Sequence, residues 1–65
     1  MPIPRFDIFC GHVNADASQI ETVEGLGNAY ELMTKLAARV PGRYFILDRR
    51  THMVRGSIDT SVPAQ

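Results

Sequence analysis

Alternating apolar and polar residues near the start of the chain predict a β-strand. In residues 5–13, RFDIFCGHV, an extended backbone places Phe6, Ile8 and Cys10 on one face and Phe9 on the other. We therefore expect the face with Phe6 and Ile8, or the face with Phe9, to pack against the rest of the domain.

A second stretch, residues 18–24, is shorter and half polar. Ile20 and Thr22 share one face of an extended backbone, and Glu21 and Val23 share the other. We interpret it as an edge strand, because charged side chains discourage edge-to-edge aggregation. If this stretch is a loop instead, the sheet has one strand fewer.

The segment RYFILD, residues 43–48, is apolar on both faces of a strand. Tyr44 and Ile46 point one way, and Phe45 and Leu47 point the other. This double-sided character predicts a central strand of the sheet.

Residues 49–52, RRTH, have the length of a hairpin turn between this strand and a further one. The further strand is predicted over residues 53–59, MVRGSID. Val54 and Ile58 would lie on one of its faces, and more polar side chains on the other.

Between the two predicted hairpins, apolar residues recur at spacings of three and four, which predicts one helix over residues 26–40. Pro41 ends the helix, because proline disfavours the α region at the residue before it. Gly25 and Gly27 are expected to shape the turn into the helix. The apolar stripe of the helix consists of Leu26, Ala29, Met33, Leu36, Ala37 and Val40.

The order of these elements, β-β-α-β-β, predicts an α+β fold. We expect a four-stranded antiparallel sheet, or a three-stranded one without residues 18–24, with the helix across one face. The 65 residues should form one small domain. Its ends, residues 1–4 and 60–65, are expected to be frayed.

One helix can cover only one face of such a sheet, so apolar side chains remain on the other. The sequence does not decide which face the helix covers, so the candidates come from both faces of the central strand and from the first strand. They are Phe9, Tyr44, Phe45 and Leu47. Large exposed apolar patches are rare on monomers and mark interfaces. We therefore expect a second copy to cover this face in a symmetric homodimer.

The length of the chain favours the same expectation. Below roughly 70–80 residues, a single core rarely supplies more than about 3–5 kcal/mol of stability. Cys10 is the only cysteine, so a disulfide within one chain is excluded. Two histidines and one cysteine make a closed structural zinc site improbable. Self-association is the stabilising device that remains.

The formal net charge is zero, but the charges are unevenly placed. Residues 1–34 hold one basic and five acidic residues, whereas residues 35–55 hold six basic residues and only Asp48 as an acid. This segregation has three interpretations: ordinary solvated charges, complementary self-association, and binding of nucleic acid, which we favour less. The candidate nucleic-acid or partner contacts are Arg43, Arg49, Arg50, His52 and Arg55.

Candidate catalytic and metal-binding groups are few. Cys10 and His12 would emerge on one strand face, with His52 as the only other histidine. A free cysteine more often fills core volume than binds metal. The carboxylates of Glu21, Glu24 and Glu31 have nothing in the sequence to bring two of them into one pocket. We therefore predict no catalytic residue, no metal site and no cofactor.

Several short segments resemble those of a group of small bacterial proteins. They are FDIF at the start, VEGL at the helix entry, PGRYF at the start of the central strand and IDTS near the end. The resemblance covers most of the chain and implies the β-β-α-β-β arrangement. It implies no activity and no functional residue.

The expected function is that of a small interaction protein acting as a homodimer without catalytic activity. The alternative is a nucleic-acid-binding or regulatory module that uses the hairpin around Arg49 and Arg50. No apolar run is long enough to span a membrane, so no membrane partner is expected. A single reduced cysteine and a start without the layout of a secretory signal favour the cytoplasm.

Overall fold

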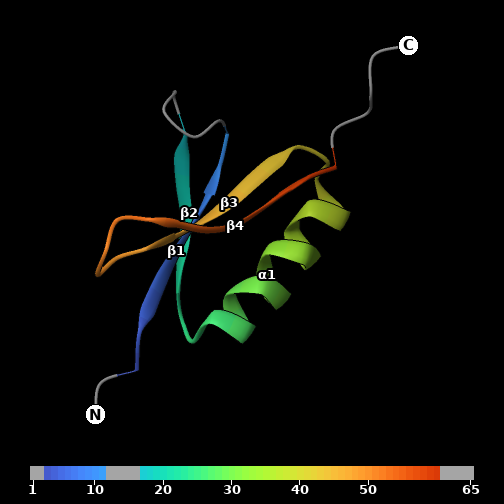
Figure 1. Cartoon of the computed structure of the whole chain (residues 1–65). Coiled ribbons are helices and arrows are strands. Elements are labelled where there is room, and N and C mark those ends of the chain that lie inside the picture. Colours follow the sequence, from blue (N-terminus) through green and yellow to red (C-terminus); the bar gives the residue numbers. More distant parts are fainter. Residues whose placement is uncertain (1–2, 12–16, 61–65) are drawn as a thin grey trace.

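The computed structural model describes residues 3–11 and 17–60, which form one antiparallel sheet and one helix (Figure 1). The strands pair in the order β2-β1-β3-β4, so β1 and β3 are central and β2 and β4 are the edges. This confirms the predicted α+β fold with four strands. The elements are β1 (Arg5–Cys10), β2 (Ser18–Glu24), α1 (Leu26–Arg39), β3 (Arg43–Asp48) and β4 (Val54–Asp59).

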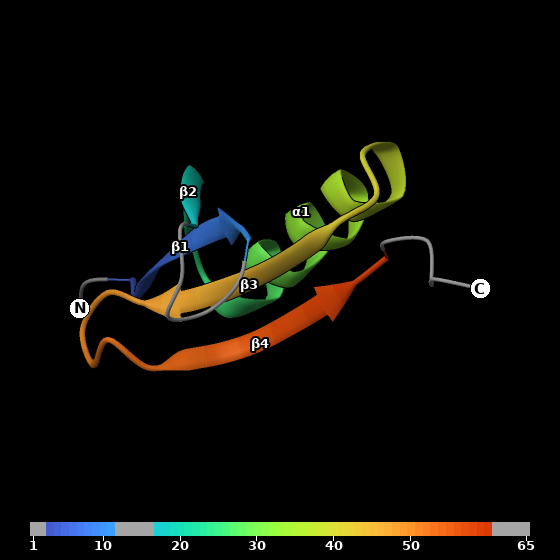
Figure 2. The ribbon, with the colours of Figure 1, turned by 90° about the horizontal axis from the view of Figure 1, so that it is seen from above.

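The helix lies along one face of the sheet, and the core fills the space between them (Figure 2). Ile8 and Ile46, which are Cα partners in β1 and β3, are fully buried beneath Met33 of α1. Burying each side chain of this size contributes about 1.5–3 kcal/mol. The buried core cluster consists of Phe6, Ile8, Ala29, Met33, Ala37, Tyr44 and Ile46.

The start of α1 depends on Gly25. This residue has φ 87°, a conformation that glycine adopts without steric strain. Its N–H donates to the carbonyl of Pro4 at 2.9 Å, which ties the helix entry to the beginning of β1. The side chain of Asn28 donates to the carbonyl of Glu24 at 3.0 Å.

The end of α1 differs from the prediction at Val40. This residue adopts an extended conformation and is 63% exposed, so the apolar stripe ends at Ala37 rather than Val40. The cause is Pro41, which disfavours helical dihedrals at the preceding residue. The helix itself confirms the predicted span to within one residue.

Thr60 does not belong to a frayed end. Its hydroxyl donates to the carbonyl of Ala37 at 2.8 Å and accepts from the N–H of Gly42 at 3.2 Å. Its own N–H donates to the carbonyl of Gly42 at 2.8 Å. Thr60 thereby joins the end of β4 to the last turn of α1. Residues 61–65 and 1–2 lie outside the described residues.

A bulge interrupts the pairing of β3 with β4. Ile46 pairs with Gly56 and Leu47 pairs with Val54, so Arg55 is the extra residue. A bulge shifts the alternation of side chains by one position. For this reason Val54 is 40% exposed and does not share the buried side of Ile58, as strict alternation had predicted.

Candidate interaction surface

The face of the sheet opposite α1, called the open face below, carries an aromatic pair at its centre. Phe9 of β1 and Phe45 of β3 are Cα partners, and their rings stack with centroids 5.1 Å apart and an interplanar angle of 6°. Leu47 follows Phe45 on the same face of β3. We refer to Phe9, Phe45 and Leu47 as the open-face patch. No helix or strand among residues 3–11 and 17–60 lies over it.

Two expectations about this surface need correction. Tyr44 is not part of it, because it lies on the α1 side and is only 4% exposed. Phe45 is on the open face, but it is only 6% exposed rather than standing in water. Phe9 and Leu47 are half-buried. The accessible apolar area of the single chain is therefore smaller than the strand pattern had suggested.

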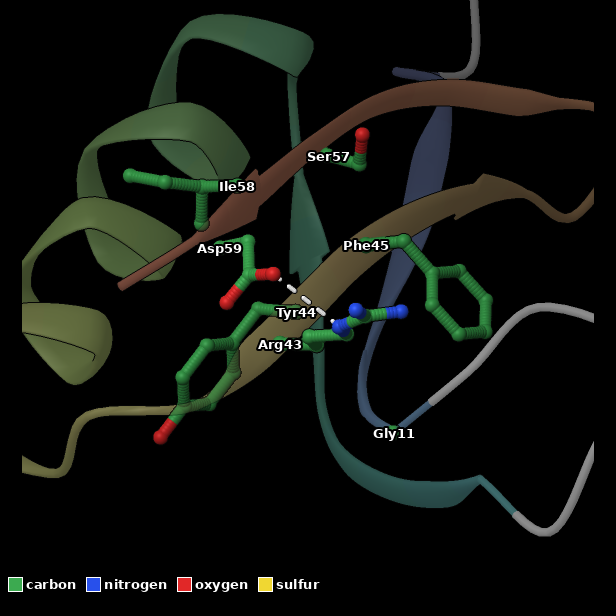
Figure 3. A pocket seen from close by; sticks show the side chains of 7 residues that line it. All are labelled: Gly11, Arg43, Tyr44, Phe45, Ser57, Ile58 and Asp59. Carbon is green, nitrogen blue, oxygen red and sulfur yellow. Dashed lines mark ion pairs between the residues drawn. The ribbon is translucent and has the colours of Figure 1, made fainter. Parts of the chain in front are cut away.

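Beside Phe45 the surface is hollowed into an open depression of about 400 Å³ (Figure 3). Polar groups of β3 and β4 stand at its border: the hydroxyl of Ser57 and the ion pair between Arg43 and Asp59, whose Nε and Oδ2 atoms are 3.0 Å apart. The depression is lined by Gly11, Arg43, Tyr44, Phe45, Ser57, Ile58 and Asp59.

The other end of the open face is polar and hydrogen-bonded around Asp7. The Thr22 hydroxyl donates to Asp7 Oδ1 at 2.7 Å, and Gln19 Nε2 donates to the same oxygen at 3.2 Å. Arg49 Nε lies 3.7 Å from Asp7 Oδ2. These contacts compensate a carboxylate that is only 9% exposed. The strand pattern did not distinguish Asp7 from an ordinary solvated charge; only its position opposite Thr22 in the sheet does so.

The predicted basic cluster is divided by the fold. Arg49, Arg50 and His52 belong to the β3–β4 turn, and Arg55 follows in β4, but Arg43 lies at the opposite end of β3. Arg55 Nη1 is 3.4 Å from Asp48 Oδ2. Arg49 is paired with Asp7 and Arg43 with Asp59, so three of the five candidate cationic residues have an aspartate partner. Such pairing reduces the net positive potential offered to a phosphate backbone.

The turn itself depends on Asp48 and His52. Asp48 is 7% exposed, and its Oδ1 accepts the N–H of Arg50 at 2.9 Å. The N–H of His52 donates to the Asp48 carbonyl at 2.7 Å. His52 has φ 59°, in the left-handed region that a turn of this kind requires of one residue. His52 therefore has a structural role in the hairpin.

Cys10 is half-buried at the margin of the core, where it is the Cα partner of Tyr44. Burial raises the pKa of Tyr44 above its ordinary value, and the neighbouring Cys10 adds to the rise. The protonated Tyr44 hydroxyl donates to the carbonyl of Val40. His12, the suggested neighbour of Cys10, lies outside the described residues. Within the part of the chain that the structure describes, no three His, Cys, Asp or Glu side chains are grouped to hold a metal ion.

The three glutamates considered as acid–base groups, Glu21, Glu24 and Glu31, are surface charges. Glu24 Oε2 lies 3.7 Å from Arg5 Nε across the β1–β2 pair, and Glu31 Oε1 lies 3.2 Å from Lys35 Nζ one helical turn away. Glu21 is exposed on β2. In the described ranges, no helix is long and apolar enough to cross a membrane.

The segments behind the sequence resemblance occupy junctions of this fold. FDIF forms most of β1, VEGL joins β2 to α1, PGRYF contains the first three residues of β3, and IDT comprises the last two residues of β4 and Thr60. Comparison with protein-family models, with curated proteins and with solved structures finds no match. The resemblance therefore stays a prediction.

Proposed function

We propose that this protein is a small interaction protein that acts as a homodimer and has no catalytic activity of its own. The observation that supports the proposal is the open-face patch. Phe9, Phe45 and Leu47 adjoin one another at the centre of a sheet face over which no described helix or strand lies. A patch of this kind in the middle of a sheet is suited to burial by a second protein surface.

The geometry of the surrounding residues favours a second copy as the occupant. In a two-fold dimer the same patch serves both partners, so the half-buried Phe9 and Leu47 of each chain, supported by the buried Phe45 ring, meet the same surface of the other. The Arg43–Asp59 and Arg49–Asp7 pairs border the patch and would form the polar rim of an interface. The depression beside Phe45 offers space for a side chain of the second copy.

The energetics are consistent with coupling between folding and association. Fully burying one large apolar side chain contributes about 1.5–3 kcal/mol. Phe9 and Leu47 are only half-buried in the single chain, so each would gain the rest of this contribution in a dimer. The remaining parts of these two contributions are a substantial fraction of the stability of about 3–5 kcal/mol expected of a core this small. Dimer formation would thus raise the melting temperature as the concentration rises.

The nucleic-acid alternative receives less support. Arg43, Arg49 and Arg55 each have an aspartate within 4.0 Å. Phe45, an aromatic side chain that could stack on a base, is buried. Stacking platforms require an exposed ring face.

The substitution Leu47→Glu tests the proposed dimer. A carboxylate at the centre of the interface would face its symmetry mate or the partner's phenylalanines, so we expect the two-chain species to be lost. Light scattering at micromolar concentration gives the mass, and circular dichroism shows whether the chain remains folded. Val40→Glu is the matched control, because Val40 is 63% exposed at the far end of α1.

A milder change keeps the test decisive if Leu47→Glu fails to fold. Leu47→Ala should keep the native circular dichroism spectrum, lower the fraction of dimer at a given concentration, and lower the melting temperature most at the concentrations where the unmodified chain is dimeric. If neither Leu47 variant changes the mass relative to Val40→Glu, the open-face patch is not the interface.

A further inference from the structure

The outer edge of β4 is a second surface suited to self-association, distinct from the open-face patch. Thr60 donates its N–H to Gly42 across the β3–β4 ladder at 2.8 Å. In an antiparallel pair, backbone groups alternate between pointing toward the partner strand and away from it. Residues 56, 58 and 60 therefore point their backbone groups at β3, and Ser57 points its N–H and carbonyl away from the sheet.

The stretch from Gly56 to Thr60 lacks the usual obstacles to strand addition. Edge strands are commonly protected by proline, by lysine or by a bulge. This stretch contains neither proline nor lysine, and the bulge at Arg55 lies before it. The carboxylate of Asp59 is already paired with Arg43 at 3.0 Å.

The sequence of β4 is self-complementary in one antiparallel register. When two copies pair with Ser57 opposite Ser57, position 55 meets position 59, so Arg55 at the bulge, whose Nη1 is 3.4 Å from Asp48 Oδ2 of its own chain, faces an aspartate position of the other copy. Gly56 then faces Ile58. Opposite charges at paired positions stabilise an antiparallel ladder, and like charges destabilise it.

The other edge of the sheet is less suited to the same contact. The middle residue of β2 is Glu21, so pairing two copies about it would place one glutamate opposite the other. Glu24 adds a further negative charge to that strand, partly offset by Arg5 at 3.7 Å. The difference between the two edges points to β4.

The contact between Tyr30 and β4 prepares this edge. The Tyr30 hydroxyl donates to the carbonyl of Arg55 at 2.7 Å, and its ring lies over Gly56 on the α1 side. This packing joins the edge strand to the helix near the middle of β4. An edge held in place loses less conformational freedom when another strand is added.

We propose that two copies of the chain pair their β4 edges antiparallel about Ser57, which extends the four-stranded sheet to eight strands across the pair. The contact goes beyond the proposed open-face dimer and can operate together with it, as a dimer of dimers. Because a short edge buries little apolar area, it should be the weaker contact and form at higher concentration.

Amide hydrogen exchange at Ser57 tests the proposal directly. We expect the Ser57 amide to exchange slowly at the high concentrations used for NMR and to lose this protection on dilution. The Thr60 amide is the internal control, because its bond to Gly42 lies within the chain and should protect it equally at both concentrations. If Ser57 exchanges at the rate of an unstructured peptide at every concentration while Thr60 stays protected, the proposal is overturned.

Substitution separates this edge from the open face. Ser57→Pro removes the outward N–H and should abolish the concentration-dependent increase in mass beyond the open-face dimer, whereas Ser57→Ala should retain it. If Leu47→Glu leaves association unchanged and Ser57→Pro removes it, the edge contact stands and the open-face dimer fails. If Ser57→Pro has no effect on mass at any concentration, the edge contact fails and the open-face proposal is untouched.

Discussion

Two neighbouring residues of β3 stand in different environments, although both are large and aliphatic. Ile46 is fully buried between the sheet and Met33 of α1. Leu47, on the opposite face, is only half-buried and has no described helix above it. The same strand therefore contributes to one interface that the chain completes by itself and to one that it leaves incomplete.

The difference shows how a small chain divides its apolar side chains. A 14-residue helix can cover one face of a four-stranded sheet, and α1 does so with Ala29, Met33 and Ala37. The open face is closed partly by its own contacts, such as the stacked rings of Phe9 and Phe45. We infer that the first face determines the fold and that the second is available for recognition.

The largest expected effect on the free energy of unfolding comes from a substitution on the face of the sheet that α1 covers. Ile46→Ala would leave a cavity beneath Met33, and changes of this kind cost about 2–5 kcal/mol. Since the whole domain is expected to have about 3–5 kcal/mol, the variant should be unfolded or nearly so in urea titrations followed by circular dichroism. Leu47→Ala is the matched control and should remain folded. Equal loss of structure in both variants would remove the distinction between the two faces.

A smaller effect is expected at the contact between α1 and the edge strand. A Cβ at Gly56 would meet the hydroxyl and two ring carbons of Tyr30, so Gly56→Ala should displace the ring from Arg55 and cost about 1–3 kcal/mol. A double variant that combines Gly56→Ala with Tyr30→Ala distinguishes a clash with the Tyr30 ring from a general loss of stability in β4. The alanine at position 56 should cost much less in the Tyr30→Ala background. An equal cost in both backgrounds would show that Tyr30 is not responsible.

The elements of the fold were predictable because their patterns are local. The short run of apolar residues around Ile46 predicts a buried strand, and the spacing of three and four around Met33 predicts a helix; both predictions are confirmed. The exceptions arise where the backbone departs from regular geometry. Val40 leaves the helix before Pro41, and Val54 loses its expected side at the bulge.

The candidate surface was less predictable, because it depends on contacts between distant segments. The segregation of charge along the sequence suggested a basic and an acidic half, but the pairing of β1 with β3 brings Asp7 next to Arg49. The strand pattern also could not decide which of Tyr44 and Phe45 faces the helix. Only the position of α1 resolves this, and it places Tyr44 in the core.

Sedimentation equilibrium of the unmodified protein at micromolar concentration is the most direct test of the homodimer. The proposal predicts a mass of at least two chains of 7.2 kDa, together with a melting temperature that rises with concentration. A well-folded species of 7.2 kDa whose melting temperature does not depend on concentration would contradict it.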